Sequence, residues 1–405
     1  MTRRINSWTR LSAFVVAAAV LLLTSVFAPG AWAANRYKVL YKFKGGADGG
    51  STRGAVIFDQ SGNLYGTTTD GGAGGAGKVF KLAPNGSGRW TETVLYSFKN
   101  DGTDGNTPLS GLIFDQAGNL YGTTAGGGAK GNYGTVFQLT PNSGGTWTEN
   151  VLHSFDVSDG YEPYTGNLIF DQSGNLYGGT NLGGLYGNGV VFQLIPNGDG
   201  TWTENVLYSF GAEGTSPIAN LIFDQKGNLY GTAFSGGTDG AGAAFELTPN
   251  GGGTWTENVL HWFTGRDECA LSAGLIFDQS GNLYGTAGSL CGTGKSGTVF
   301  ELTPNGSGGW TETVLHSFKG RDGRSPYAGL VFDQSGNLYG TTFQGGAYGY
   351  GTVFKLTPNG KGSWTESVLH SFADRPGASP WAGVIFDSAG NLYGTTADCV
   401  FEITP

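Results

Sequence analysis

Positive charge and long apolar runs are both scarce in this sequence. The 405 residues include 22 lysines and arginines against 31 aspartates and glutamates. Three of the arginines lie in an N-terminal segment that we expect to be removed, which leaves 19 basic against 31 acidic residues and a net charge of −12. Nucleic acids and anionic membranes bind basic surfaces, so neither is expected as a partner. After residue 33 no stretch is apolar enough to span a membrane, and none has a helical period.

The N-terminus is the exception and has the pattern of an export signal. Three arginines between positions 3 and 10 precede the apolar run 11–28, and Ala31-Trp32-Ala33 forms an A-x-A cleavage site. Residues 1–33 are therefore predicted to be a signal peptide, and the mature protein to be secreted, extracellular or periplasmic. The run approaches the ~18 residues that can begin to span a bilayer, so an uncleaved anchor is the alternative. No sorting tail follows before the end at Pro405.

Glycine is the most distinctive residue, with 75 copies among 405. A strict G-X-Y period is absent, which excludes collagen, and 25 Phe, 18 Tyr and 10 Trp provide enough apolar surface to argue against disorder. A Phe-Asp pair recurs at intervals of 53–56 residues, and such a period indicates a repeat architecture. Its aspartates are Asp59, Asp115, Asp171, Asp224, Asp278, Asp333 and Asp387.

Each repeat contains four short segments rich in β-branched and aromatic residues, separated by Gly, Asn and Pro. In the second repeat these are residues 111–116, 119–124, 134–140 and 147–155. The pattern predicts a four-stranded antiparallel meander, with strands a to d. Seven such units predict an all-β, seven-bladed β-propeller, with strand a nearest the central axis.

The two ends of the chain support a closed ring. Residues 37–43 resemble strand d of the first repeat at 93–98, whereas the last repeat ends after its strand c at 400–403. We therefore expect residues 37–43 to complete the last blade, so that 34–405 forms a single propeller without an open sheet edge. A β-solenoid would gain nothing from this offset.

The residues most often associated with catalysis occur at equivalent positions of the repeats. The four histidines share one position of strand d with tyrosines, and a propeller would keep them too far apart to bind one ion. We predict a structural role for them, packing between blades for the strand-d tryptophans, and no catalytic acid pair, because equivalent glutamates have equivalent environments. The histidines are His153, His261, His316 and His370, alternating with Tyr41, Tyr96 and Tyr208. The tryptophans are Trp90, Trp147, Trp202, Trp255, Trp310 and Trp364, and the glutamates Glu92, Glu149, Glu204, Glu257, Glu312 and Glu366.

Two glycine-rich stretches resemble nucleotide-binding loops without meeting their requirements. Residues 71–77 lack the strand–loop–helix context of a dinucleotide fold, and 288–296 has Ser289 where the phosphate-binding loop needs glycine. No cofactor and no metal are predicted.

The three cysteines suggest one disulfide and one free thiol. Cys269 lies in the d–a connection that leads into the fifth repeat, and Cys291 in the b–c connection of that repeat. Both connections emerge on one face of the ring, so a Cys269–Cys291 disulfide is predicted, worth about 3 kcal/mol. Their spacing is not that of a C-x-x-C redox pair. Cys399 begins a strand c and is expected to be a buried free thiol.

The connections d–a and b–c vary most, so function is expected on that face. In each repeat a proline, or an equivalent residue, precedes strand a. The seven residues that directly follow it should together surround the channel mouth. We assign this position to Thr52, Leu109, Tyr164, Ile218, Ser272, Tyr327 and Trp381. The b–c connections add Tyr133, Tyr186, Tyr348 and Tyr350. Aromatic rings beside carboxylates and amides suit sugars; the alternative is that these tyrosines only cover loops. Calcium at 101–106 is less favoured, because the spacing differs from the EF-hand loop.

The repeated sequence F-D-Q-S-G-N-L-Y is interpreted as a β-hairpin that occurs once in each of the seven repeats. Asp59 is expected to accept hydrogen bonds in the turn, Gly62 to take positive φ, and Asn63 to start strand b. Calcium at this turn is the alternative.

The repeated words F-D-Q-S-G-N-L-Y-G-T-T, T-V-F-K-L-T-P and W-T-E-T-V-L-Y-S-F resemble those of the Gloeo/Verruco (GloVer) family of exported bacterial choice-of-anchor repeat proteins. The resemblance covers residues 37–405. It implies an extracellular repeat protein without an established activity. The word D-x-x-G-N-L-Y is also similar to NHL-type and lyase or lactonase propellers, but their catalytic or metal-binding residues have no counterpart here.

These observations favour a secreted, monomeric, non-catalytic protein that binds polysaccharide or a cell-surface component through its variable loop face. One alternative is an extracellular carbohydrate-active lyase or hydrolase. Another is a purely structural or adhesive protein.

Overall fold

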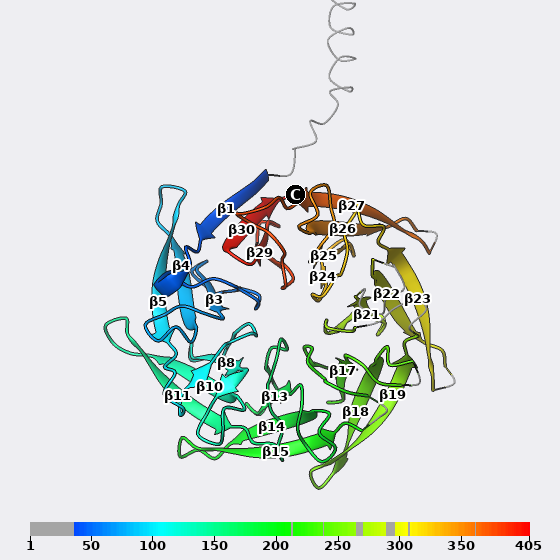
Figure 1. The fold of residues 1–405 in the computed structure, drawn as a ribbon. Coiled ribbons are helices and arrows are strands. Elements are labelled where there is room, and N and C mark those ends of the chain that lie inside the picture. The colour runs from blue at the N-terminus through cyan, green and yellow to red at the C-terminus, as the bar shows by residue number, and fades with distance from the viewer. Residues whose placement is uncertain are drawn as a thin grey trace, which may run out of the picture.

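The computed structural model describes residues 36–211, 214–237, 239–264, 270–288, 296–306, 308–360 and 362–405. Seven four-stranded antiparallel sheets are arranged around a central axis (Figure 1). This confirms the predicted seven-bladed β-propeller. Within the described ranges the one helical element is the 3₁₀ turn η1 (Gly46–Asp48), and no helix is long and apolar enough to cross a membrane.

The strands of each blade follow one another outward from the axis. The innermost are β2 (Ile57–Phe58), β7 (Ile113–Phe114), β12 (Ile169–Phe170), β16 (Ile222–Phe223), β20 (Ile276–Phe277), β24 (Val331–Phe332) and β28 (Ile385–Phe386). The second layer contains β3 (Leu64–Thr68), β8 (Leu120–Thr124), β13 (Leu176–Gly179), β17 (Leu229–Ala233), β21 (Leu283–Ala287), β25 (Leu338–Thr342) and β29 (Leu392–Thr395).

The two outer layers contain longer strands. Strands c are β4 (Lys78–Pro84), β10 (Thr135–Pro141), β14 (Val190–Pro196), β18 (Ala243–Gly251), β22 (Thr298–Pro304), β26 (Thr352–Pro358) and β30 (Cys399–Thr404). Strands d are β5 (Trp90–Ser97), β11 (Trp147–Ser154), β15 (Trp202–Ser209), β19 (Thr254–Trp262), β23 (Trp310–Ser317), β27 (Trp364–Ser371) and β1 (Arg36–Lys42). A further pair, β6 (Gly105–Asn106) and β9 (Gly126–Gly127), joins two loops of the second blade.

The ring closes as the sequence predicts. Strand β1 pairs with β30 in the order β1-β30-β29-β28, with Tyr37 opposite Ile403 and Val39 opposite Phe401 (Figure 1). The first and last strands of the chain thus lie in one sheet, and β30 has no free edge.

Strand a is shorter than predicted, with two residues in the second blade where six were expected. The preceding residues form hydrogen bonds to neighbouring blades instead. The Gly111 N–H donates to Asn167 Oδ1 at 2.7 Å, and the Ser110 carbonyl accepts from Thr67 Oγ1 at 2.9 Å. Equivalent threonine-to-carbonyl bonds of 2.9–3.1 Å join Thr232 to Ala273, Thr286 to Ala328, Thr341 to Ala382 and Thr395 to Gly54. The repeated Y-G-T word therefore links blades.

Each hydrophobic cluster spans two adjacent blades. One of them combines Tyr65 and Phe98 of the first blade with Leu120 and Phe137 of the second, and the rings of Phe98 and Phe137 are 5.1 Å apart. The glycine of the Y-G-T word makes room for this packing, because a Cβ at Gly66 would lie 2.7 Å from Phe80 Cζ. The strand-d tryptophans contact tyrosines of the preceding blade in the pairs Trp90–Tyr393, Trp202–Tyr121, Trp310–Tyr230 and Trp364–Tyr284, as predicted.

Candidate ligand-binding site at the mouth of the central channel

A backbone kink precedes strand a in every blade. Its first residue is non-glycine yet has φ between 50° and 60°, a left-handed conformation that is uncommon for residues with a Cβ. These residues are Ser51, Thr107, Glu162, Ser216, Ala270, Ser325 and Ser379. The side chain two positions further on points to the channel mouth in six blades, where Arg53, Tyr164, Ile218, Ser272, Tyr327 and Trp381 line one cavity.

The kink corrects one assignment made from the sequence. Thr52 was expected at the mouth, but it occupies the place of the proline. It is fully buried, and its Oγ1 donates to the Thr396 carbonyl. Arg53 is therefore the residue that the first blade contributes. The first blade has no proline before strand a, and the assignment was wrong by one residue. The spacing of six residues before the repeat aspartate, as at Leu109 and Trp381, would have marked Arg53. Leu109, the second-blade residue, is also buried and lies outside this cavity.

The cavity has a volume of about 520 Å³, within the ~300–1,000 Å³ typical of small-ligand sites. It brings together three of the predicted aromatic residues, Tyr164, Tyr327 and Trp381. The rings of Tyr327 and Trp381 are stacked, with centroids 5.6 Å apart and planes inclined by 18°. Phe343, which the sequence did not single out, packs 4.3 Å from Trp381 and supports this pair.

Arg53 lies against the aromatic pair. Its guanidinium carbon is 4.7 Å from the Trp381 ring centroid, and one terminal N–H group donates to Tyr164 Oη at 3.2 Å. Stacking on an indole suits the flat guanidinium and fixes its orientation. The first, third and seventh blades thus meet through this one side chain.

The third and fourth blades contribute polar groups to the opposite wall of the cavity, beside Ile218 and Phe234. Asn181 Nδ2 donates to Glu162 Oε2 at 2.9 Å, and Asn220 Oδ1 accepts from the Asn167 N–H at 2.7 Å. The site predicted from the sequence included neither Glu162 nor the asparagines. A comparison of the position four residues before each repeat aspartate, where most blades have Gly or Ala, would have revealed Asn167 and Asn220.

The remaining predicted aromatic residues do not join this cavity. Tyr133 lines a second hollow of about 500 Å³ and packs 5.3 Å from Tyr161. The side chains of Tyr186, Tyr348 and Tyr350 are 62%, 63% and 37% exposed on the b–c loops. The structure therefore separates the predicted set into a central group and a peripheral group.

Of the three cysteines, the structure describes one. Cys269 and Cys291, the predicted disulfide partners, lie outside the described residues. Cys399 is a free thiol with no solvent exposure, as predicted, and burial raises its pKa to about 11.

The turn aspartates form a closed set of local hydrogen bonds. Asp59 Oδ1 accepts from the N–H groups of Ser61 and Asn63, both at 2.9 Å. Its Oδ2 accepts from Asn63 Nδ2 at 2.7 Å and from Tyr65 Oη at 3.0 Å, and Gly62 has φ of 79°. These bonds fix the a–b hairpin on the face opposite the cavity. At 101–106, Asp101 Oδ1 likewise accepts from the Thr103 and Asp104 N–H groups.

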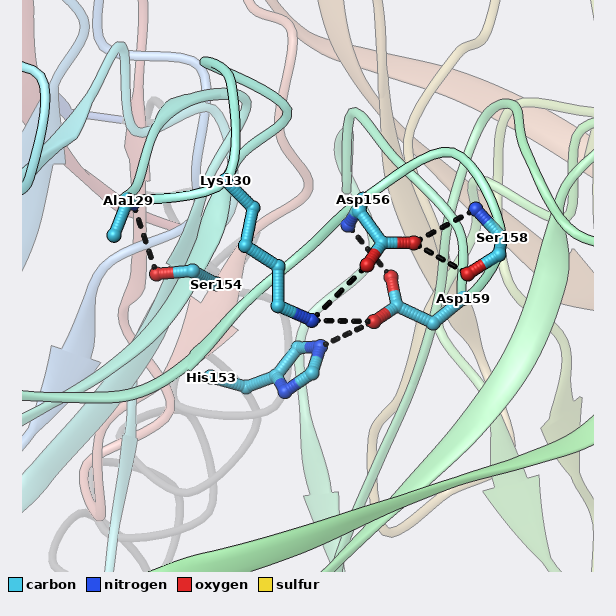
Figure 2. A network of polar contacts seen from close by, with 7 residues as sticks. All are labelled: Ala129, Lys130, His153, Ser154, Asp156, Ser158 and Asp159. Carbon is cyan, nitrogen blue, oxygen red and sulfur yellow. Dashed lines mark hydrogen bonds and ion pairs between the residues drawn. The ribbon is translucent and has the colours of Figure 1, made fainter.

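Three of the four strand-d histidines meet acidic residues at blade boundaries, whereas His370 stacks on Tyr37 with ring centroids 4.0 Å apart. His153 Nε2 is 3.1 Å from Asp159 Oδ2, and Lys130 Nζ lies 3.1 Å from Asp156 and 3.3 Å from Asp159 (Figure 2). At another boundary the ligand atoms of His316, Asp322 and Glu366 come within 4.8 Å of one another, which makes this the group in the described part of the chain that could hold a metal ion. The sequence did not predict this group, because its members come from two blades.

Strand-d glutamates also lie at these boundaries. Oε1 of Glu149, Glu204 and Glu366 is buried without a hydrogen-bond partner, and burial together with a nearby aspartate raises each pKa to about 7. At the equivalent position Glu92 forms an ion pair with Lys78 instead. The repeat therefore places one residue type in two electrostatic environments.

Glu149→Gln is expected to stabilise the protein above pH 7 and to be neutral near pH 4.5. The folded-state pKa of Glu149, about 7, lies above the ordinary value of 4.5, so the folded state binds more protons between these values. The contribution of this residue to stability therefore falls as the pH rises through that interval. With allowance for solvent screening, we expect a gain of about 1 kcal/mol at pH 8. Urea denaturation at pH 5 and pH 8 measures it, and equal effects at both values would contradict the assignment.

The fold and the site define a closed β-propeller with a ligand-sized cavity at one mouth of its channel. The sequence profile of the Gloeobacter/Verrucomicrobia repeat family matches residues 30–171, 131–311 and 289–402. The chain therefore belongs to this family. No curated protein matches the sequence.

Several solved structures share the propeller fold. The extracellular domain of a proposed hybrid two-component system from B. thetaiotaomicron has a TM-score of 0.54 at 13% identity, over 91% of this chain and 41% of that one. A proposed 6-phosphogluconolactonase from Bacteroides uniformis has a TM-score of 0.54 at 15% sequence identity, over 82% of this chain and 88% of that one. An ancestral GH74 enzyme has a TM-score of 0.54 at 11% sequence identity, over 87% of this chain and 48% of that one. At these identities the likeness concerns the fold alone.

Proposed function

We propose that this protein is exported and binds a saccharide in the cavity at the channel mouth, without catalysing its turnover. The observation that carries the proposal is the composition of the cavity walls. Tyr327 and Trp381 form an aromatic wall, and Asn181 and Glu162 lie on the wall opposite. A sugar ring combines apolar C–H faces with peripheral hydroxyls, so it matches both walls. Export is proposed from the predicted signal peptide at 1–33, which lies outside the described residues.

The set of acids in the cavity favours binding over hydrolysis. Glycosidases use two carboxyl groups that flank the scissile bond, about 5–10 Å apart. Among the described residues that line the cavity, Glu162 is the one carboxylate, and its Oε2 already accepts a hydrogen bond from Asn181. A hydrolase of this kind would need a second carboxyl group at this place.

The double variant Tyr327→Ala/Trp381→Ala is expected to lower saccharide affinity at least about 100-fold. Truncating one aromatic anchor commonly costs about 2 kcal/mol, or about 30-fold in affinity, and this variant truncates two. A glycan array identifies the ligand, and isothermal titration calorimetry measures the change. Tyr186→Ala/Tyr348→Ala is the matched control, because it removes two exposed tyrosines outside the cavity.

The control should bind like the wild type, and melting curves should show that both variants are folded. Unchanged binding by the Tyr327/Trp381 variant would exclude this cavity as the site. Release of reducing ends or unsaturated products from the bound saccharide would favour an enzyme instead.

A further inference from the structure

Building on the proposed function, we infer that the bound saccharide carries a carboxylate and that Arg53 binds it. The ligand class is then a uronic-acid-containing saccharide rather than a neutral one. Arg53 occupies the position that was assigned to Thr52 from the sequence, and it lines the cavity wall.

Arg53 is held in a fixed orientation but has unused donors. A guanidinium has five N–H donors in one plane. Trp381 supports one face of the group at 4.7 Å, and Tyr164 Oη accepts one hydrogen bond at 3.2 Å. The remaining N–H groups lie at the edge of the guanidinium. This planar fork matches the two oxygens of a carboxylate, so little side-chain entropy would be lost on binding.

Arg53 also lacks an acidic neighbour, in a chain where acids outnumber bases. No carboxylate of the described residues forms an ion pair with it, although 31 acidic residues are present in the sequence. A positive charge in a cavity wall without an ion-pair partner is a feature expected of an anion-binding site.

Glu162 determines which way round the ligand would bind in the cavity. It lies in the third blade among the asparagines of the polar wall, and its carboxylate is engaged by Asn181. A second negative charge on the ligand would be repelled there, whereas a hydroxyl could donate to it. The arrangement therefore fits one sugar whose carboxylate meets Arg53 and whose hydroxyls meet Glu162 and the asparagines.

The test compares each acid with its own neutral ester. Glucuronate, galacturonate and short oligogalacturonates are titrated beside their methyl esters and the corresponding hexose 6-sulfates, by calorimetry and by saturation-transfer NMR. The free acid should bind at least about 10-fold more tightly than the ester, since a hydrogen bond to a charged group contributes about 1.5 kcal/mol or more. Its affinity should fall as salt is raised.

Variants then assign the preference to Arg53. Arg53→Gln should remove the difference between acid and ester, and Arg53→Lys, which keeps the charge without the fork, should retain only part of it. Arg324→Gln is the matched control, because it removes an exposed arginine from a d–a loop of the same face outside the cavity. This control should keep the full preference.

Several results would overturn the inference: equal affinity for acid and ester, a preference for the sulfate, or an acid preference that persists in Arg53→Gln. If a neutral sugar binds and the Tyr327/Trp381 variant abolishes that binding, the proposed function stands and the carboxylate assignment fails. If no saccharide binds, both fail.

Discussion

A variant that lacks residues 36–43 is expected to lose about 5–10 kcal/mol of unfolding free energy and to aggregate on heating. The deletion removes β1, including Leu40, and Phe43 directly after it, which are 7% and 3% exposed; truncation of such core residues costs about 2–5 kcal/mol each. It also leaves the edge of β30 unpaired, and such an edge is a template for association with other chains. Differential scanning calorimetry and light scattering measure both effects.

A circular permutant is the matched control, because it keeps every residue that the deletion removes. The new chain begins at Lys44, continues to Pro405 and then passes through a copy of residues 85–90 into Arg36–Phe43. In the first blade, residues 85–89 form the turn between strand c, which ends at Pro84, and strand d, which begins at Trp90. The copied segment therefore supplies this turn and the first residue of a strand d. The permutant should melt within a few degrees of the wild type. A deletion variant that melts like the wild type would contradict the role of β1 in closing the ring.

Glu92→Gln is expected to lower the free energy of unfolding by about 3 kcal/mol at pH 7. Lys78 Nζ has no solvent exposure and lies 2.5 Å from Glu92 Oε1 and 3.4 Å from Asp48 Oδ1. Removing one partner of a buried ion pair leaves the other charge without compensation, which commonly costs about 3–5 kcal/mol. Asp48 stays in contact, so a value near the lower limit is expected. Urea denaturation gives the change.

The same substitution at Glu149 has the opposite expected sign, which makes the two variants a paired test. Strand c has threonine at the Lys78 position in the second blade, where Thr135 faces Ser154 as Lys78 faces Ser97. The double variant Lys78→Thr/Glu92→Gln should therefore recover most of the lost stability, because it removes both charges together. Destabilisation of similar size by Glu92→Gln and Glu149→Gln would show that Lys78 is irrelevant to the effect.

The architecture could be read from the sequence because repetition makes many weak signals agree. One hairpin word is ambiguous, but seven copies at 53–56 residues require a repeat of constant size, and four strand segments within that period define a blade. The displaced strand at 37–43 then required a closed ring. Contacts within one repeat, such as those of Asp59 with Ser61, Asn63 and Tyr65, join residues that are close in the sequence, so they could also be predicted from it.

The site was only partly predictable, because it is made of the differences between repeats. Tyr164, Tyr327 and Trp381 were found through the preceding proline. The first blade lacks that proline, and the position was assigned to Thr52 instead of Arg53. Packing of the strand-d tryptophans between blades was predicted, but the polar contacts between blades were not. The approach of His316 to Glu366 depends on how far one outer strand reaches toward the next. Sequence spacing carries no such information.

The kink before strand a has a consequence for how ligand specificity can change. In each blade the left-handed residue fixes the backbone, and in six of the seven blades the side chain two positions later contributes to the mouth without helping to form the kink itself. Single codon changes at six positions, from Arg53 to Trp381, could therefore create a different binding site on an unaltered ring. Binding sites built from long loops usually need insertions or new loop conformations for the same result. A saturation library at these six positions would explore new specificities while leaving the hydrophobic clusters intact.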